Sequence, residues 1–186
     1  MSTSLIVLIV FVAAAFYAVF VYNGLVALRQ RVNQAFADID VQLKQRHDLI
    51  PNLVETVKGY ASHERDTLEA VVQARNSAIA AHSPEQIAAA ENALTGALRQ
   101  LFALAEAYPD LKANANFQQL QAELSDIENK IAAARRFFNN AVQEYNTSIE
   151  QFPASLFAGP LGFRHREFFD LGETRPQLEQ VPSVKF

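Results

Sequence analysis

Residues 117–152 read FQQLQAELSDIENKIAAARRFFNNAVQEYNTSIEQF. In this segment apolar side chains recur every three or four residues for about five heptads, which is the repeat of one face of a long α-helix. Such a helix must bury its apolar stripe against other helices, as in a bundle or a coiled coil. The stripe consists of Phe117, Leu120, Leu124, Ile127, Ile131, Ala134, Phe138, Val142, Tyr145, Ile149 and Phe152.

Prolines divide the chain before this segment into three further helical segments. Pro51, Pro84 and Pro109 lie where the apolar repeat breaks, and proline is tolerated in the first turn of a helix but not in its interior. A turn is expected at Pro51, because the residue before a proline disfavours helical dihedral angles; the alternative is a kink within one long helix. The run Ser83–Gln86 has the residues of a capping box, and Asn114 is a suitable N-cap for the last helix.

No segment has the alternating pattern of a β-strand, so the sequence predicts an all-α fold. The expected architecture is an N-terminal transmembrane helix (residues 1–28) that continues into an antiparallel up-down four-helix bundle (residues 29–153). An irregular C-terminal part follows, with an aromatic and basic segment and a flexible tail (residues 154–186). Residues 171–186, which are polar and interrupted by proline, form that tail.

The N-terminal segment is expected to be a membrane anchor. Residues 1–28 carry no charged side chain, and residues 5–22 form an unbroken apolar run, which is long enough because a spanning helix needs about 20 apolar residues. The alternatives are a cleaved signal peptide and a helix buried in a soluble core. A signal peptide is opposed by the lack of Lys or Arg before the run and by its continuation past Ala13–Ala15. The candidate anchor residues are Leu5, Val12, Phe16, Phe20 and Tyr22.

Two arginines set the expected orientation of this anchor. Arg29 and Arg31 follow the apolar run closely, whereas no basic side chain precedes it. By the positive-inside rule, the N-terminus would lie outside the membrane and the body of the protein in the cytoplasm.

The composition and the motifs exclude several classes of function. Lys and Arg number 16 against 20 Asp and Glu, and the net charge of −4 gives no reason to expect nucleic-acid binding. The absence of cysteine excludes disulfides, thiolate metal sites and cysteine nucleophiles. No Glu has a His three residues later, as a di-iron bundle requires, and no nucleophile elbow, phosphate loop or dinucleotide motif occurs. We therefore expect no catalytic residue, metal site, cofactor or small-molecule substrate, and solvated side chains for His47, His63, His82 and His165.

Polar residues flank the apolar stripes of the first and last helices. Three interpretations are open: solvated flanks, a network of interhelical hydrogen bonds and ion pairs that fixes the helix register, or part of a ligand site. The residues of this candidate network are Asp38, Arg46, Glu128, Arg135, Asn139 and Asn146.

The segment after Pro153 combines aromatic and basic side chains, a composition suited to a membrane interface with anionic lipid. The last helix, from about Asn114 to Gln151, would be about 57 Å long, whereas the first extends only about 36 Å beyond Asn23. In an up-down bundle the end of the last helix would therefore reach the bilayer surface. The alternatives are that the aromatic side chains cap the bundle or form a surface for a partner or a second copy. The candidate interface residues are Phe157, Phe163, Arg164, Arg166, Phe168 and Phe169.

Several ordered motifs resemble those of the LemA family. The clearest is DIDVQLKQRHDLIPNLV at residues 38–54, and YNGLV at 22–26 begins at the last residue of the apolar run. EAYPDLKAN at 106–114 and ARRFFN at 134–139 are also similar, although the family commonly has Tyr at the position of Phe138. The resemblance covers residues 22–169. It implies a bacterial, single-span membrane protein with a helical-bundle body, and it implies no established enzymatic activity.

The leading functional hypothesis is a non-enzymatic, membrane-anchored scaffold or adaptor that self-associates or docks a membrane partner. Its expected partners are the lipid bilayer and a second copy or another membrane protein, and its expected location is the bacterial inner (plasma) membrane. The alternative is a sensor that binds a small ligand in the bundle and transmits the signal through the first helix, which requires a polar-lined cavity. A metal-dependent enzyme is the third hypothesis, and the missing ligand spacing opposes it.

Overall fold

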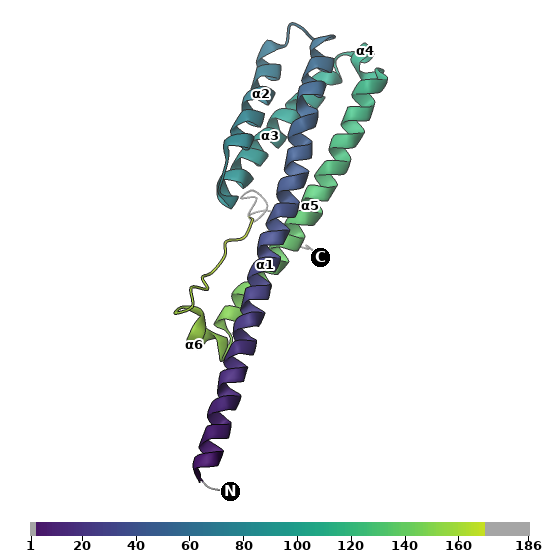
Figure 1. Ribbon diagram of the computed structural model, residues 1–186. Helices are drawn as coiled ribbons and strands as arrows, with labels where there is room; N and C mark the ends of the chain where they lie inside the picture. The colour runs from purple at the N-terminus through teal and green to yellow at the C-terminus, as the bar shows by residue number, and fades with distance from the viewer. Residues whose placement is uncertain (1–2, 170–186) are drawn as a thin grey trace, which may run out of the picture. The chain divides into compact units, whose positions relative to one another are not determined.

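The structure is a computed structural model in which residues 3–169 are described. Figure 1 shows the helices α1 (Thr3–Lys58), α2 (Arg65–Ala80), α3 (Pro84–Ala105), α4 (Pro109–Lys112), α5 (Ala115–Glu150) and α6 (Ala154–Ala158). No strand occurs among residues 3–169, so the predicted all-α class is confirmed. The predicted flexible tail at 171–186 lies outside the described residues.

The helices form two compact units, each with its own packing. The first unit contains residues 3–39 and 134–168, and the second contains residues 40–133 together with Phe169. Because α1 and α5 contribute to both units, the packing of residues 29–153 as one four-helix bundle stays a prediction.

In the first unit α5 runs antiparallel to α1. The rings of Phe138 and Phe36 pack with their centroids 5.7 Å apart. Further along α5, Glu144 accepts from Nη1 of Arg31 at 2.7 Å, at an earlier position of α1. Side chains of both helices are buried in this unit: Leu25, Val32, Ala35, Ile39, Phe138, Ala141, Val142, Tyr145 and Ile149.

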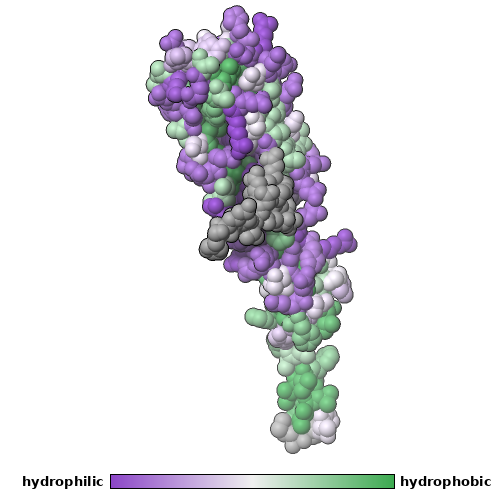
Figure 2. Space-filling view, turned by 180° about the vertical axis from the view of Figure 1, so that it is seen from behind, coloured by the Kyte–Doolittle hydropathy of each residue, from purple (hydrophilic) through white to green (hydrophobic). Residues whose placement is uncertain are grey.

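The N-terminal part of α1 exposes its apolar side chains. Among the described helices, α1 is long and apolar enough to cross a membrane, and none of its most apolar window is buried. Figure 2 shows this hydrophobic surface uncovered at the bottom of the picture. The interpretation of the segment as a helix buried in a soluble core is therefore wrong. All five candidate anchor residues are exposed: Leu5, Val12, Phe16, Phe20 and Tyr22.

The core of the second unit is built from the C-terminal part of α1, the N-terminal part of α5, and α2, α3 and α4. Helices α2 and α3 pack against each other. The core side chains are supplied by all five helices and include Ile50, Leu53 and Val57 of α1, Leu68 and Val71 of α2, Leu94, Leu98 and Leu101 of α3, Leu111 of α4, and Phe117 and Leu124 of α5.

Two predicted helix starts are confirmed by their capping hydrogen bonds. The hydroxyl of Ser83 accepts from the backbone N–H of Gln86 at 3.2 Å, and the Gln86 side chain accepts in return from the Ser83 N–H. The side chain of Asn114 accepts from the backbone N–H of Phe117 at 3.0 Å, directly before α5. Each cap satisfies a backbone donor that has no partner within its own helix.

The predicted turn at Pro51 is wrong, because α1 continues through this residue to Lys58. Pro51 has no N–H, so the carbonyl four residues earlier, that of His47, lacks its helical donor. Nε of Arg75 on α2 donates to this carbonyl at 2.7 Å. A tertiary hydrogen bond thus replaces the missing helical one, and the predicted second segment is divided between α1 and α2.

We expect Arg75→Ala to lower the free energy of unfolding by about 1.5–3 kcal/mol, because the His47 carbonyl would lose a charged donor. In a Pro51→Ala background, the restored N–H at position 51 can bond this carbonyl, so the same change should cost much less. Thermal melts of the four proteins, followed by circular dichroism, measure this coupling as a double-mutant cycle. Equal costs in the two backgrounds would contradict the role of Arg75.

Candidate functional site

A cluster of charged side chains is buried in the second unit. Glu91 on α3 is 0% exposed, and Arg46 and His47 on α1 are 3% and 8% exposed. Nη1 of Arg46 donates to Oε2 of Glu91 at 2.9 Å, and Nε2 of His47 lies 2.6 Å from Oε1. Because the arginine-paired carboxylate can only accept hydrogen bonds, we assign a proton to Nε2 of His47.

The predicted solvation of the histidines is wrong for His47. That prediction placed His47 at the end of a helix, before a turn at Pro51. Since α1 continues to Lys58, His47 instead lies inside a helix and faces α3, where Glu91 accepts its hydrogen bond.

Arg46 extends this cluster to α5. Its Nη2 donates to the hydroxyl of Thr95 at 2.8 Å and pairs with Oε2 of Glu128 at 3.1 Å. Arg46 and Glu128, which the sequence singled out as members of an interhelical network, are therefore in contact. The planar guanidinium offers several donors in a fixed geometry, so one side chain connects α1, α3 and α5.

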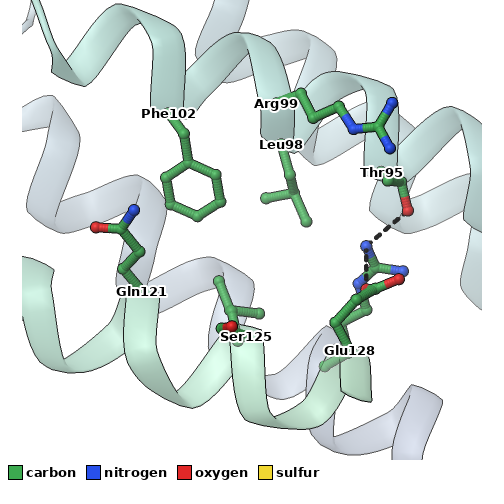
Figure 3. Close-up of a pocket in the computed structure, with 9 residues that line it drawn as sticks. Thr95, Leu98, Arg99, Phe102, Gln121, Ser125 and Glu128 are labelled. Carbon is green, nitrogen blue, oxygen red and sulfur yellow. Dashed lines mark hydrogen bonds and ion pairs between the residues drawn. The ribbon is translucent and has the colours of Figure 1, made fainter. Parts of the chain in front are cut away.

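A cavity of about 300 Å³ lies between α3 and α5, beside this cluster. In Figure 3, Leu98 and Phe102 point from α3 toward α5. Arg46 also lines the cavity and bonds to Thr95 and Glu128. The cavity lining thus combines apolar with polar and charged side chains. Its lining residues are Arg46, Thr95, Leu98, Arg99, Phe102, Gln121, Leu124, Ser125 and Glu128.

A second cavity of about 370 Å³ lies between α1 and the region where α2 is followed by α3. It has apolar walls and a charged rim. Desolvation of the Asp40 carboxyl at this rim raises its pKa above the ordinary value, although the residue as a whole is exposed. The lining residues are Asp40, Leu43, Lys44, His47, Asp48, Ala78, Ile79, Ala81 and Ile87.

In the first unit, Asn146 holds the chain that follows α6. Its side-chain amide donates to the carbonyl of Arg166 at 2.9 Å, and its carbonyl oxygen accepts from the Arg166 N–H at 2.9 Å. The guanidinium of Arg166 also donates to Asn33 on α1 at 3.4 Å. Asn146 therefore binds a non-helical segment, whereas the sequence predicted a partner on another helix.

Phe163, in the part of the segment after α6 that belongs to the first unit, is buried, with 3% exposure. Gly162, at φ +77°, makes the turn that precedes it, a conformation that glycine adopts without strain. The ring of Phe163 packs edge-on against Tyr22 at 5.7 Å between centroids, and the guanidinium carbon of Arg29 lies 5.2 Å from its centroid.

The other candidate interface and network residues differ in their surroundings. Phe157, Phe168, Arg164 and Arg166 are exposed, and Phe169 is buried but belongs to the second unit. Asp38 is exposed, and no hydrogen bond or ion pair of its side chain is found within residues 3–169. Arg135 is buried and Asn139 is half-buried, and both have interaction partners.

Sequence reasoning missed Glu91, the centre of the buried cluster. Glu91 directly follows Ala88–Ala90, and alanine is the strongest helix former, so this stretch resembles an ordinary helix interior. A signal was present: Ile87, Glu91, Leu94 and Leu98 follow one another at spacings of four, three and four, so the carboxylate occupies a position of the apolar stripe. A single acidic residue at such a position indicates a buried charge that needs a partner.

The charged groups of the cluster bind one another. Among the described residues, no group of three or more His, Cys, Asp or Glu side chains is arranged to hold a metal ion. Both oxygens of Glu91 accept hydrogen bonds from within the cluster. The arrangement is therefore suited to fixing the helix register.

Comparison with known proteins places the chain in a family. The sequence profile of the LemA family matches residues 35–186. The chain belongs to the LemA family. It is 28% identical to the protein LemA of Metamycoplasma hominis over 164 residues, which cover 85% of this chain and 74% of that protein. The resemblance inferred from the motifs is thereby confirmed.

A second group of relatives carries the name magnetosome protein MamQ. The chain is 26% identical to MamQ of Magnetospirillum gryphiswaldense over 174 residues, which cover 80% of this chain and 64% of MamQ. The chain thus spans less than two thirds of that relative's length. Family membership and the exposed apolar part of α1 together support a LemA-like membrane protein, with one candidate membrane helix within residues 3–169.

Proposed function

We propose that this LemA-family protein is a non-enzymatic, membrane-anchored scaffold that self-associates or docks another membrane protein. The observation that carries the proposal is the continuity of α1. This helix begins in the exposed apolar run and ends with Ile50, Leu53 and Val57 in the core of the second unit. One continuous helix would therefore serve both as the anchor and as a structural part of the folded body, as a scaffold at a membrane requires.

The buried cluster supports a structural role. Arg46 and His47 bind Glu91, and Arg46 also binds Thr95 and Glu128. General acid–base catalysis needs a titratable group within hydrogen-bond reach of a substrate. Glu91 is fully buried and occupied by two donors, so its carboxylate serves the packing of α1 against α3.

A crosslinking experiment in membranes tests the scaffold role. A photoreactive amino acid at Ile79, which is 50% exposed on α2 and lines the second cavity, should give a discrete adduct with a protein or a second copy. Gln73 is exposed on the same helix and does not line this cavity, so it is the matched control. A chain that forms no adduct from Ile79 and has the mass of a monomer in nanodiscs would contradict the scaffold role.

The expected orientation places the N-terminus outside the bacterial inner membrane and the body in the cytoplasm, because Arg29 and Arg31 follow the apolar run. A reporter that is active only in the cytoplasm should therefore be active when fused after Phe186. Moving both positive charges to the N-terminal side of the run should invert or scramble the insertion. Activity of a periplasmic reporter at the same fusion point would show the opposite orientation.

The cavity between α3 and α5 favours a second candidate function, a sensor that binds a small ligand. Polar side chains contribute to the lining of this cavity, as such a sensor requires, and Arg99 and Ser125 are exposed there. In a thermal-shift screen of the full chain, a ligand of this site should raise the melting temperature of the wild type but not that of Arg99→Ala. A screen in which the two proteins respond alike would favour the scaffold.

A further inference from the structure

The register of the first unit brings the chain after α5 to the end of the apolar run. Residues later in the C-terminal part of the chain contact residues earlier in α1. Phe138 packs on Phe36, Glu144 pairs with Arg31, and Phe163 packs on Tyr22, the last residue of the apolar run. Residues 152–168, which we call the collar, therefore lie beside the point where the exposed span ends.

The collar is held firmly in this position. Phe163 lies against Tyr22 and Arg29, and the Asn146 side chain makes two hydrogen bonds to the backbone of Arg166. These contacts attach the collar to α1 and α5 within the first unit.

The helix within the collar is oriented opposite to an ordinary surface helix. Its small residues, Ala154 and Ala158, are buried, whereas Leu156 is 62% exposed and Phe157 is 38% exposed. A soluble protein normally turns the larger apolar side chains inward. Large exposed apolar side chains recur throughout the collar, at Phe152, Leu156, Phe157, Leu161 and Phe168. Several large apolar side chains exposed within one short segment indicate an apolar environment outside the protein.

The first unit also carries basic side chains in the collar and on the part of α1 that the collar contacts. Arg29 and Arg164 make no ion pair within residues 3–169, and Arg166 bonds a neutral amide, that of Asn33. The nearby acidic groups are largely paired, since Glu144 binds Arg31 and Glu150 binds His165. Glu167 is exposed and is the remaining acidic side chain of the collar. The surface therefore offers uncompensated positive charge next to exposed apolar groups.

We propose that the collar binds the membrane surface, with its exposed apolar side chains at the headgroup–acyl boundary and Arg29, Arg164 and Arg166 on the phosphates of anionic phospholipids. Amphipathic interfacial segments combine apolar and basic side chains in this way. The bilayer is the occupant that the structure favours over a protein, because the collar is continuous with the exposed span. The anchor holds the collar beside the lipid at a high effective concentration. Lipid binding by the collar needs no protein partner, so this proposal does not depend on the proposed scaffold function.

The absence of tryptophan from the chain allows a direct test. A single tryptophan is introduced into the full chain, and the chain is reconstituted in nanodiscs that contain phosphatidylcholine and phosphatidylglycerol. In each sample one of the two lipids carries brominated acyl chains, which quench the fluorescence of a tryptophan that contacts them. Leu156→Trp should be quenched, as should the inserted reference Phe20→Trp. Phe137→Trp is the matched control, because Phe137 is exposed on α5 about 22 Å before Phe152 and should stay bright.

The brominated lipid that quenches the tryptophan of the collar more strongly shows which headgroup the collar prefers. At equal overall composition, brominated phosphatidylglycerol should quench Leu156→Trp more than brominated phosphatidylcholine does. Arg164→Gln should reduce this preference about fivefold, the effect of one basic side chain near an anionic surface.

Three results would overturn the proposal. If Leu156→Trp stayed bright while Phe20→Trp was quenched, the collar would face water or protein. If both brominated lipids quenched Leu156→Trp equally, the arginines would not bind anionic headgroups. A bright Phe20→Trp would remove the anchored bilayer on which the collar depends. Phe157→Trp repeats the test at a second exposed position, and helicity measured by circular dichroism shows that each variant is folded.

Discussion

Replacing Glu91 by alanine is expected to lower the free energy of unfolding by about 3–5 kcal/mol, because it leaves His47 without its anionic partner and buried Arg46 with only the half-buried Glu128. Glu91 is fully buried and accepts from both side chains at 2.9 and 2.6 Å. For a domain of this size, such a loss lowers Tm by roughly 10 °C. Thermal melts of the full chain in mild detergent, followed by circular dichroism, measure it.

Two controls separate this effect from a general loss of negative charge. Glu85→Ala removes an exposed carboxylate from the first turn of the same helix and should change Tm little. A triple variant with Arg46→Met, His47→Leu and Glu91→Leu replaces the whole cluster by apolar side chains and should recover most of the lost stability. If Glu91→Ala melted like the wild type, the buried ion pairs would not stabilise the second unit.

Much of the fold could be predicted from the sequence, because its determinants are local. The apolar repeat of residues 117–152 and the caps at Ser83 and Asn114 are all recorded within a few residues of the helices that they specify. The path of the chain at Pro51 could not be predicted in the same way. The helical hydrogen bond that Pro51 cannot donate to the His47 carbonyl is replaced by one from Arg75, 28 positions away in the sequence. Only the tertiary structure therefore shows that the helix continues.

The candidate site shows the same limit. Arg46 and Glu128 were identified because each stands beside an apolar stripe, and the structure places them 3.1 Å apart. The partner that is buried most deeply, Glu91, was hidden within a helix-forming alanine stretch. His47 was missed for a reason that follows from the error at Pro51, since a residue at a helix end is expected to be solvated.

The contact of the collar with α1 was partly predictable. Helix lengths alone indicated that the end of the last helix returns toward the membrane, and the aromatic and basic composition marked the segment as an interface. Composition could not show which aromatic residue packs inward. The structure shows that Phe163 does, whereas Phe157 and Phe168 remain exposed, because the turn at Gly162 directs the chain back onto Tyr22 and Arg29.

Replacing Ile131 by alanine is expected to lower the free energy of unfolding by about 2–5 kcal/mol, through lost apolar contacts and the cavity that remains. Ile131 lies in the middle of the stripe that defines α5 and is 0% exposed. Ile79→Ala removes the same atoms from a residue that is 50% exposed on α2, so it is the matched control and should change stability by less than about 0.5 kcal/mol. Thermal melts of the two variants compare the same Ile-to-Ala change at a buried and at a half-exposed position. Equal melting temperatures would mean that the three–four repeat of residues 117–152 does not face the core, and the main basis for the predicted fold would be lost.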